Sequence, residues 1–239
     1  MSSTTDIFGL AFKDYLGGET EEEIIVNIDK FGDDELPVSY FFRDYNAMPL
    51  WEQMVLDVCR GKVLDAGAGA GSHALYLQEK GLEVTAVDVS EGAVLCMQQR
   101  GVKNAVCMDF YKLPTEKYDT ILFLMNGAGM AQKIHMLQTL LEKAAGMLNP
   151  DGAIFLESTD LLYMFEEEDG SAMIDLAGDY YGEVVYTLRY KQYSGEPFPW
   201  LFVDFDNLKY IAGQAGLQCQ EFFRGETDNF VAKLTLTKL

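Results

Sequence analysis

The sequence predicts a mixed α/β fold, a doubly wound and mostly parallel sheet. Between residues 62 and 158, short apolar stretches alternate with segments whose apolar residues recur at the helical period. That alternation is typical of parallel strands joined by crossover helices. After residue 204, one more helical segment is followed by two β-rich stretches that we expect to pair antiparallel. The two closing strands and the five of the alternating region would make a seven-stranded sheet.

Glycines and turn residues mark where the elements of the alternating region end. Gly81 and Gly101 stand at helix ends, where a left-handed residue is favoured. They predict helices over 72–80 and 90–100, and a third helix should end before an NPDG turn at 149–152. The expected strands are 62–65, 83–88, 105–109, 120–125 and 153–157.

Three further segments surround this core within one predicted domain, 1–239. Residues 1–60 are expected to form a helical cap whose last helix buries one apolar face, and 61–158 the core. Residues 159–203 are interpreted as an inserted β-hairpin, with runs at 182–193 and 197–205 around an SGE turn. Residues 204–239 should supply a closing helix at 207–216 and strands at 218–224 and 229–237. The predicted apolar face of the cap helix consists of Leu50, Met54, Val55 and Val58.

The composition narrows the range of partners. The chain carries 38 acidic against 18 basic residues, a formal net charge of -20, which would repel a phosphate backbone. No apolar run approaches the roughly 20 residues of a membrane-spanning helix, and the N-terminus lacks the features of a secretory signal. Four scattered cysteines suggest neither a disulfide framework nor a metal site. These features predict a cytoplasmic protein with no nucleic-acid, membrane or metal partner.

Residues 63–72 read VLDAGAGAGS, an apolar strand followed by a glycine-rich turn. Such a turn lets a ligand lie against the backbone and permits positive φ angles. Gly67 and Gly69 fit the dinucleotide pattern G-x-G-x-x-G, but Ser72 occupies its third position. Asp65, at the end of the strand, would oppose a pyrophosphate and would suit an ammonium group. The turn therefore favours a ligand that carries a positive charge.

The stretch from Asp65 to Gly71 resembles motif I, D/E-x-G-x-G-x-G, of the class I S-adenosylmethionine-dependent methyltransferases. The resemblance extends over about residues 60–158 and the closing strand pair. It implies that Asp88, in VTAVDVS, accepts hydrogen bonds from both ribose hydroxyls of the cofactor. It also implies that Asp109, in CMDF, meets the adenine amino group. The carboxylates at 65, 88 and 109 each end a predicted strand in order, as a ligand lying across the carboxyl ends of the strands requires.

The resemblance predicts S-adenosyl-L-methionine as cofactor, S-adenosyl-L-homocysteine as product and a class I fold of the Rossmann-like type. The predicted cofactor residues are Asp65, Gly67, Ala68, Gly69, Asp88, Val89, Met108, Asp109, Phe110, Met125 and Asn126. Tyr40, Arg43, Tyr181 and Trp200 are predicted to contact the substrate. Arg43 could also meet the cofactor's carboxylate. The two segments that carry the predicted substrate residues, 39–45 and the predicted hairpin, are rich in aromatic residues, which suits a small organic acceptor.

The reaction that this family implies needs no unique catalytic side chain, because alignment of the nucleophile, the methyl group and the sulfur supplies most of the catalysis. His73 and His135 are interpreted as packing or surface residues, and no catalytic residue is assigned. Asn126 is followed by Gly127 and Ala128, so the D/N-P-P-Y/F/W motif of nucleic-acid amino methylation is absent. We therefore expect a small-molecule methyltransferase, as a monomer or homodimer.

Three alternatives stay open at this point. The chain could be a methyltransferase-like protein that binds the cofactor without catalysis, a protein methyltransferase, or an NAD-dependent oxidoreductase. Asp65 and Ser72 speak against the last. The identity of the acceptor, and whether O, N or C is methylated, are not encoded in any motif.

Overall fold

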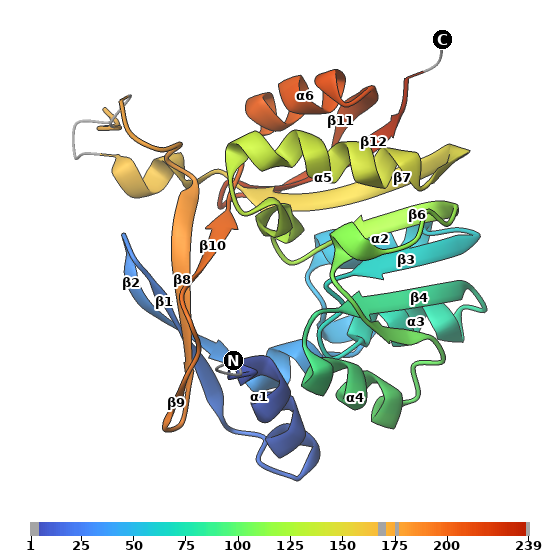
Figure 1. Ribbon diagram of the computed structural model, residues 1–239, viewed down its shortest axis with the longest axis vertical. Coiled ribbons are helices and arrows are strands. Elements are labelled where there is room, and N and C mark those ends of the chain that lie inside the picture. Colours follow the sequence, from blue (N-terminus) through green and yellow to red (C-terminus); the bar gives the residue numbers. More distant parts are fainter. Residues whose placement is uncertain (1–4, 167–170, 175–176, 238–239) are drawn as a thin grey trace. The chain divides into compact units, whose positions relative to one another are not determined.

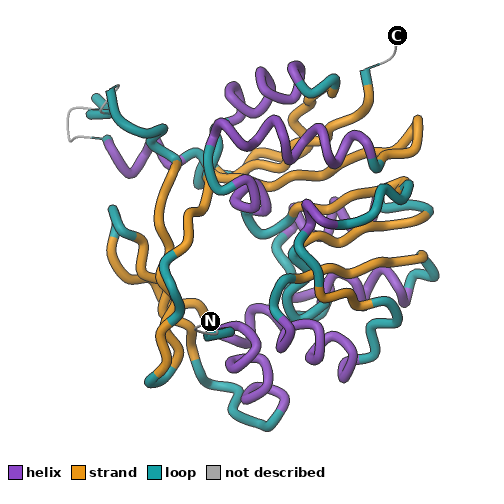
Figure 2. The backbone as a smooth tube through the Cα atoms, viewed as in Figure 1, coloured by secondary structure: helices purple, strands orange, loops and turns teal. Residues whose placement is uncertain are grey.

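The computed structural model describes residues 5–166, 171–174 and 177–237 (Figure 1). The chain divides into two compact units, which are described in turn. Unit 1 contains the chain up to Pro114 together with Val185–Phe198, and unit 2 contains Thr115–Val184 and Pro199 onward. Helices and strands alternate along most of the chain, as Figure 2 shows.

Unit 1 is built on three parallel strands. In their registers Asp65 pairs with Ala86 and Asp88 pairs with Cys107, so the carboxyl ends of the three strands share one edge. Gly101 ends one crossover helix with φ 97°, as its position in the sequence predicted. The elements are β3 (Lys62–Ala66), α3 (Ser72–Glu79), β4 (Glu83–Asp88), α4 (Glu91–Arg100), β5 (Ala105–Cys107) and η3 (Phe110–Lys112).

The N-terminal segment of unit 1 is only partly the helical cap that was predicted, because two strands lie between its helices. β1 pairs antiparallel with β2 and, on its other side, with β8 of the predicted hairpin segment. β2 has the sequence GDDELP and is mostly exposed, so it carries no apolar alternation. The elements are α1 (Ile7–Leu16), β1 (Glu23–Ile28), β2 (Gly32–Pro37), η1 (Val38–Phe42), η2 (Tyr45–Ala47), α2 (Leu50–Val58), β8 (Glu183–Tyr190, of which Glu183 and Val184 belong to unit 2) and β9 (Tyr193–Ser194), which pairs with β8.

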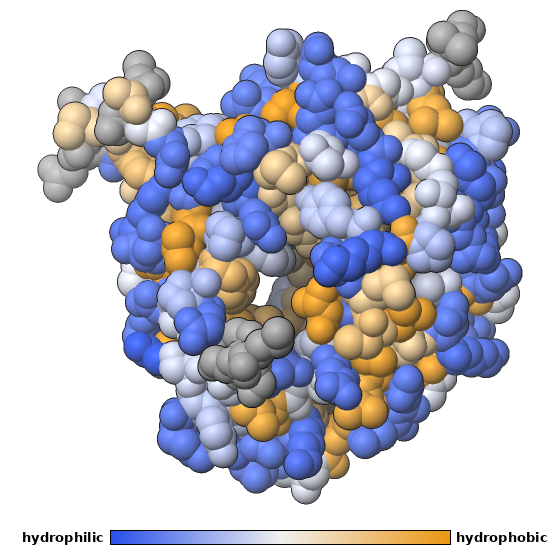
Figure 3. All heavy atoms as spheres, in the orientation of Figure 1, coloured by the Kyte–Doolittle hydropathy of each residue, from blue (hydrophilic) through white to orange (hydrophobic). Residues whose placement is uncertain are grey.

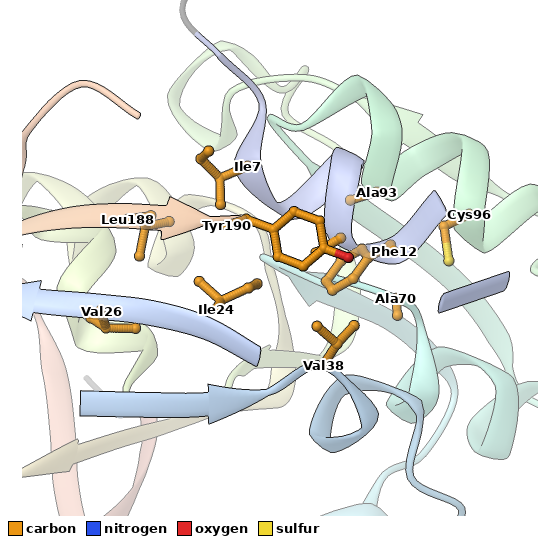
Figure 4. Close-up of a cluster of buried hydrophobic side chains, with 11 residues drawn as sticks. Ile7, Phe12, Ile24, Val26, Val38, Ala70, Ala93, Cys96, Leu188 and Tyr190 are labelled. Carbon is orange, nitrogen blue, oxygen red and sulfur yellow. The ribbon is translucent and has the colours of Figure 1, made fainter. Parts of the chain in front are cut away.

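One buried cluster joins α1 to the strands and to the glycine-rich turn (Figure 4). Phe12 of α1 is fully buried, and Tyr190 of β8 is 1% exposed. The Tyr190 hydroxyl reaches the surface of the cluster, where it donates to Asp14 Oδ2 at 3.1 Å. Such packing makes the N-terminal helix an integral part of the core. The other labelled members are Ile7, Ile24, Val26, Val38, Ala70, Ala93, Cys96 and Leu188.

The buried face of α2 differs from the predicted one. Val55 is fully buried as predicted, but Leu50 is 62% exposed and Val58 is 48% exposed. Leu56 and the carboxylate of Glu52 are buried instead. A buried glutamate on a nine-residue helix rotates the face away from the apolar pattern, which is possible only where charged partners meet it.

Unit 2 contains a parallel pair, β6 and β7, and β12, which pairs antiparallel with β7 and with β11. The predicted NPDG turn at 149–152 lies within the long strand β7. The sequence period predicts one helical face of Leu137, Leu140, Leu141, Ala144 and Leu148; the first four are buried on α5, whereas Leu148 is the first residue of β7. The elements are β6 (Tyr118–Phe123), η4 (Gly127–Ala131), α5 (Ile134–Gly146), β7 (Leu148–Thr159), η5 (Leu161–Phe165), β10 (Phe198–Leu201, of which Phe198 belongs to unit 1), α6 (Phe205–Gln214), β11 (Leu217–Arg224) and β12 (Asn229–Leu236).

The seven strands of the main sheet follow the order β11-β12-β7-β6-β3-β4-β5. The predicted mostly parallel, seven-stranded sheet with an antiparallel strand near its end is therefore confirmed. Hydrophilic residues predominate on the face drawn in Figure 3, in keeping with a net charge of -20. In the described part of the chain, no helix combines the length and the apolar character needed to cross a bilayer.

Candidate functional site

The glycine-rich turn leads from β3 to α3 and is anchored on β4. Gly67, Gly69 and Gly71 have φ angles of 76°, 55° and 84°, which side chains rarely tolerate. The amides of Gly67 and Ala68 donate to Val87 O at 2.9 and 3.0 Å. The predicted turn is thus a rigid loop at the carboxyl edge of the parallel strands.

Asp88 connects the end of β4 to this turn. Its Oδ2 accepts a hydrogen bond from Gly69 N, and its Oδ1 accepts one from Ser90 N, each at 2.9 Å. Burial raises the pKa of Asp88, and the two amides oppose that rise only in part. Each carboxylate oxygen accepts more than one hydrogen bond. Asp88, which is predicted to bind the ribose, therefore lies beside the turn, and both of its carboxylate oxygens can accept further hydrogen bonds.

The N-terminal helix α1 lies over the turn and is tied to the start of α4. A Cβ built on Gly69 would lie 3.6 Å from Phe41 Cδ1 and 4.0 Å from Phe12 Cζ. Asp6 caps α1 by accepting from Gly9 N at 2.9 Å. Its two oxygens also accept from Ser90 Oγ at 2.8 Å, and Oδ2 accepts from the amide of residue 92 at 3.0 Å. Sequence reasoning did not find Asp6, although an acid just before a helix is a capping signal.

Exposed apolar side chains stand next to Asp88. Val89 is 72% exposed and Met108 is 37% exposed, and Met108 N donates to Asp88 O at 2.9 Å. Two apolar side chains beside a carboxylate suit a flat aromatic ring such as adenine. Asp109 and Phe110 have local roles: Asp109 caps η3 by accepting from Tyr111 N at 3.0 Å, and Phe110 is 2% exposed. β5 ends at Cys107, so Met108, Asp109 and Phe110 follow that strand and are not part of it.

Asp65 is a buried carboxylate with an unused acceptor. The residue is 2% exposed, and within the described part of the chain Oδ2 has no hydrogen-bond partner. Burial raises the pKa of Asp65, while the positive charge of His73 lowers it in part. A buried carboxylate without full compensation is unfavourable unless a ligand completes it.

A second buried group has unused donors. Arg43 Nη2 contacts both carboxylate oxygens of Glu52 at 3.0 Å, and His73 Nε2 lies 2.8 Å from Glu52 Oε2. The guanidinium stacks 3.4 Å over the ring of Tyr40. Among the described residues, Nε and Nη1 of Arg43 are buried and find no acceptor. Glu52 and His73 were not assigned to the site from sequence; a glutamate among apolar helix positions was the available signal.

The charges of this network influence one another. Burial alone would lower the pKa of His73, but the hydrogen bond to Glu52 and the charge of Asp65 outweigh burial and raise it. Burial would raise the pKa of Glu52, but His73 and Arg43 hold it below its ordinary value. We call Arg43, Glu52, His73 and Asp65 the buried charge network. It leaves one anionic acceptor and two cationic donors unpaired, and an α-amino acid carries the ammonium and carboxylate that complement them.

Unit 2 contains the remaining predicted residues. Met125 and Asn126 both have φ 55°, an unusual conformation for two consecutive residues that are not glycine. Met125 N donates to Glu157 Oε2 at 2.7 Å, and Asn126 Oδ1 accepts from Thr159 Oγ1 at 2.9 Å. The end of β7 therefore holds the segment after β6 in a strained shape, which is common at functional sites.

Tyr181 and Trp200 are also held in unit 2. The Tyr181 hydroxyl donates to Asp160 Oδ1 at 2.6 Å, and burial followed by this hydrogen bond raises the pKa of Tyr181. The indole of Trp200 packs on Gly129, where an added Cβ would lie 1.9 Å from Trp200 Cε2. Gly129 belongs to η4, directly after Asn126, so Trp200 is placed beside the strained segment.

The fold and the edge of the sheet define a class of nucleoside-binding α/β proteins, and comparisons with known proteins narrow it. A family model described as a methyltransferase domain matches residues 64–156. A solved SAM-dependent methyltransferase from Bacteroides fragilis, in complex with S-adenosyl-L-homocysteine, is 37% identical. The alignment covers 100% of this chain and 98% of that chain, with a TM-score of 0.92. The chain belongs to the class I S-adenosylmethionine-dependent methyltransferases, a family that uses S-adenosylmethionine.

Two curated relatives match shorter stretches. A 23S rRNA (uracil(747)-C(5))-methyltransferase from Pyrococcus abyssi is 35% identical over 75 residues, which are 31% of this chain and 18% of that protein. A cypemycin N-terminal methyltransferase from Streptomyces sp is 33% identical over 102 residues, 41% of this chain and 42% of that protein. The chain thus matches less than half the length of either relative.

Proposed function

We propose that this protein transfers a methyl group from S-adenosylmethionine to a small organic acceptor. The observation that carries the cofactor assignment is a complementary set of unused groups in the buried charge network: among the residues that the structure describes, Asp65 Oδ2 finds no donor, and Arg43 Nε and Nη1 find no acceptor. The cofactor's amino-acid end supplies both. When bound, the cofactor supplies a methyl group that its sulfonium charge activates for displacement.

In this assignment, each part of the cofactor has its own protein residues. Asp65 holds the ammonium group and Arg43 the carboxylate, each through a charge-assisted hydrogen bond. Asp88 accepts the ribose hydroxyls, and the exposed side chains of Val89 and Met108 cover the adenine. The amides and φ angles of the glycine-rich turn let the ligand approach the backbone closely.

The acceptor side is assigned to unit 2. Asn126 belongs to the strained segment, Trp200 packs on η4 directly after it, and Tyr181 is fixed by Asp160. In-line displacement requires that the protein align the nucleophile and exclude water, and fixed aromatic side chains perform both tasks. No general base is assigned.

Charge favours a small acceptor over RNA. A chain with a net charge of -20 repels a phosphate backbone, and the proline pair and the stacking aromatic residue that follow the Asn or Asp in enzymes that methylate a flipped base are absent after Asn126. The acceptors in the names of the two curated relatives, an rRNA uracil and a peptide N-terminus, belong to proteins that this chain matches only in part. Both classes are therefore included in the test as competitors.

The test has two stages. Calorimetry should show binding of S-adenosyl-L-homocysteine, weakened in Asp88→Ala by about 1 to 3 kcal/mol, the typical loss for hydrogen bonds to a charged group. Glu142→Ala, at an exposed position on α5 of unit 2, is the control. Turnover of labelled cofactor is then measured with small amines, alcohols, phenols, peptides and an rRNA fragment. Binding without turnover on any of them would favour a non-catalytic protein, and turnover of RNA or peptide alone would refute the small-molecule assignment.

A further inference from the structure

We propose that Glu52 and His73 are positioning residues for the amino-acid end of the cofactor: Glu52 aims the Arg43 guanidinium, and His73 holds the Glu52 carboxylate in place through its contact with Oε2. This inference rests on the proposed function and extends it to two residues that touch no cofactor atom in our assignment. The geometry of the buried charge network within unit 1 supports this proposal.

Glu52 fixes Arg43 through a single nitrogen. Both carboxylate oxygens lie 3.0 Å from Nη2, while Nε and Nη1 have no acceptor among the described residues. Tyr40 holds the plane of the guanidinium from one face at 3.4 Å. A long arginine side chain normally loses considerable rotamer freedom when it binds a ligand. Here Glu52 and Tyr40 have already removed that freedom, so the unused nitrogens are presented in a fixed place.

His73 balances the charges of the network. Its Nε2 lies 2.8 Å from Glu52 Oε2, and its charge interacts with both Asp65 and Glu52. The side chains of Glu52, His73 and Arg43 are 1%, 9% and 10% exposed, so water screens them little. Two positive and two negative groups therefore lie together in the interior, and the Asp65 carboxylate, whose Oδ2 has no hydrogen-bond partner among the described residues, is compensated only in part. Removal of the Glu52 carboxylate or of the His73 charge leaves an uncompensated buried charge.

The three elements that supply these side chains explain why the arrangement is specific. Glu52 comes from α2, His73 from the first turn of α3 directly after the glycine-rich turn, and Asp65 from the end of β3. His73 thus stands between the helix that aims Arg43 and the strand that carries Asp65. Through Glu52 and His73, the network links the two ends of the proposed amino-acid site.

A comparison of two ligands tests this proposal. S-adenosyl-L-homocysteine has the amino-acid end, and 5′-methylthioadenosine shares the nucleoside but lacks that end. Calorimetry should show that Glu52→Gln and His73→Gln each lower the affinity for S-adenosyl-L-homocysteine by at least about tenfold, as expected for lost charged hydrogen bonds. The affinity for 5′-methylthioadenosine should change by no more than about twofold. A merely structural role would affect both ligands alike.

The matched control is Asp57→Asn, a neutralisation on the same helix. Asp57 is exposed and bonds to Tyr45 and Lys80 at 2.8 and 3.2 Å, so neither ligand should respond. If Glu52→Gln does not fold, His73→Gln alone tests the proposal. A glutamine at position 73 still offers a hydrogen-bond donor to Glu52, so that variant loses only the charge of the histidine. Equal losses for the two ligands, or no loss for either, would overturn the proposal. Failure of the unaltered protein to bind S-adenosyl-L-homocysteine would instead refute the proposed function.

Discussion

Gly9 of α1 and Gly92 of α4 pack backbone against backbone. A Cβ built on Gly92 would lie 2.3 Å from Gly9 Cα, and one built on Gly9 would lie 2.8 Å from Gly92 Cα. Asp6 joins the same crossing by capping α1 and accepting hydrogen bonds from Ser90 and Gly92. Ser90 in turn donates to Asp88 through its amide. The N-terminal helix is therefore connected to Asp88, the residue predicted to bind the ribose, through one short series of hydrogen bonds.

Gly92→Ala is expected to lower the free energy of unfolding by about 1 to 3 kcal/mol, the usual effect of overpacking. Its methyl group would meet backbone atoms, which cannot rotate away, so the two helices must separate. Urea denaturation of the protein measures the loss. Gly213→Ala is the control, because Gly213 lies in helix α6 with no atom within 4 Å of an added Cβ. That substitution should be neutral or stabilising, and equal destabilisation of both variants would contradict the close approach.

Asp65→Asn is expected to stabilise the protein without cofactor while weakening cofactor binding. Burial raises the pKa of Asp65, so its charge is unfavourable at neutral pH until a ligand compensates it. Removing the charge should add about 1 to 3 kcal/mol to the free energy of unfolding and reduce S-adenosyl-L-homocysteine affinity by at least about tenfold. Thermal denaturation and calorimetry provide the two measurements. A loss of stability together with unchanged affinity would show that Asp65 has a structural role only.

His73 should make the stability of the cofactor-free protein fall as the pH rises above about 6.5, the ordinary pKa of a histidine side chain. Its pKa is raised in the folded state, so above pH 6.5 the folded protein retains a proton that the unfolded chain has lost. The stabilisation is complete below the unfolded pKa and is lost as pH rises through the folded one. Urea midpoints from pH 6 to 9 should show this slope in the unaltered protein and a smaller one in His73→Gln. Identical slopes would mean that His73 is not charged in the network.

Trp200→Ala should reduce acceptor turnover more than cofactor affinity, because Trp200 packs on η4 beside Asn126. Removing the indole leaves the strained segment uncovered and the acceptor poorly aligned. We expect kcat/KM for the acceptor to fall by at least about tenfold, equivalent to about 1.4 kcal/mol of transition-state stabilisation, with the Kd of S-adenosyl-L-homocysteine nearly constant. Tyr210→Ala, at a position 69% exposed, serves as the surface control. Parallel losses of turnover and affinity would indicate a structural role.

The parts of the fold that were predicted correctly are those that depend on residues close together in the sequence. Glycines at 81 and 101 end helices, and the apolar face of α5 is buried as its period indicates. The predictions failed where polar residues form regular structure. β2 is a strand of mostly exposed residues, and the NPDG run continues β7, where Asn149 Nδ2 donates to Asp119 Oδ1 at 2.8 Å.

For the candidate site, the sequence alone determined the glycine-rich turn and the order of Asp65 and Asp88, because strand ends and tight turns depend on near neighbours. Only the tertiary structure decided that Glu52 and His73 join Arg43 and Asp65 inside the protein. Their positions span 31 residues of chain. The same holds for the pairing of β1 with β8, in which Ile25 faces Arg189. Burial of a charge, like the pairing of distant strands, depends on which remote groups compensate it, and no local pattern records that choice.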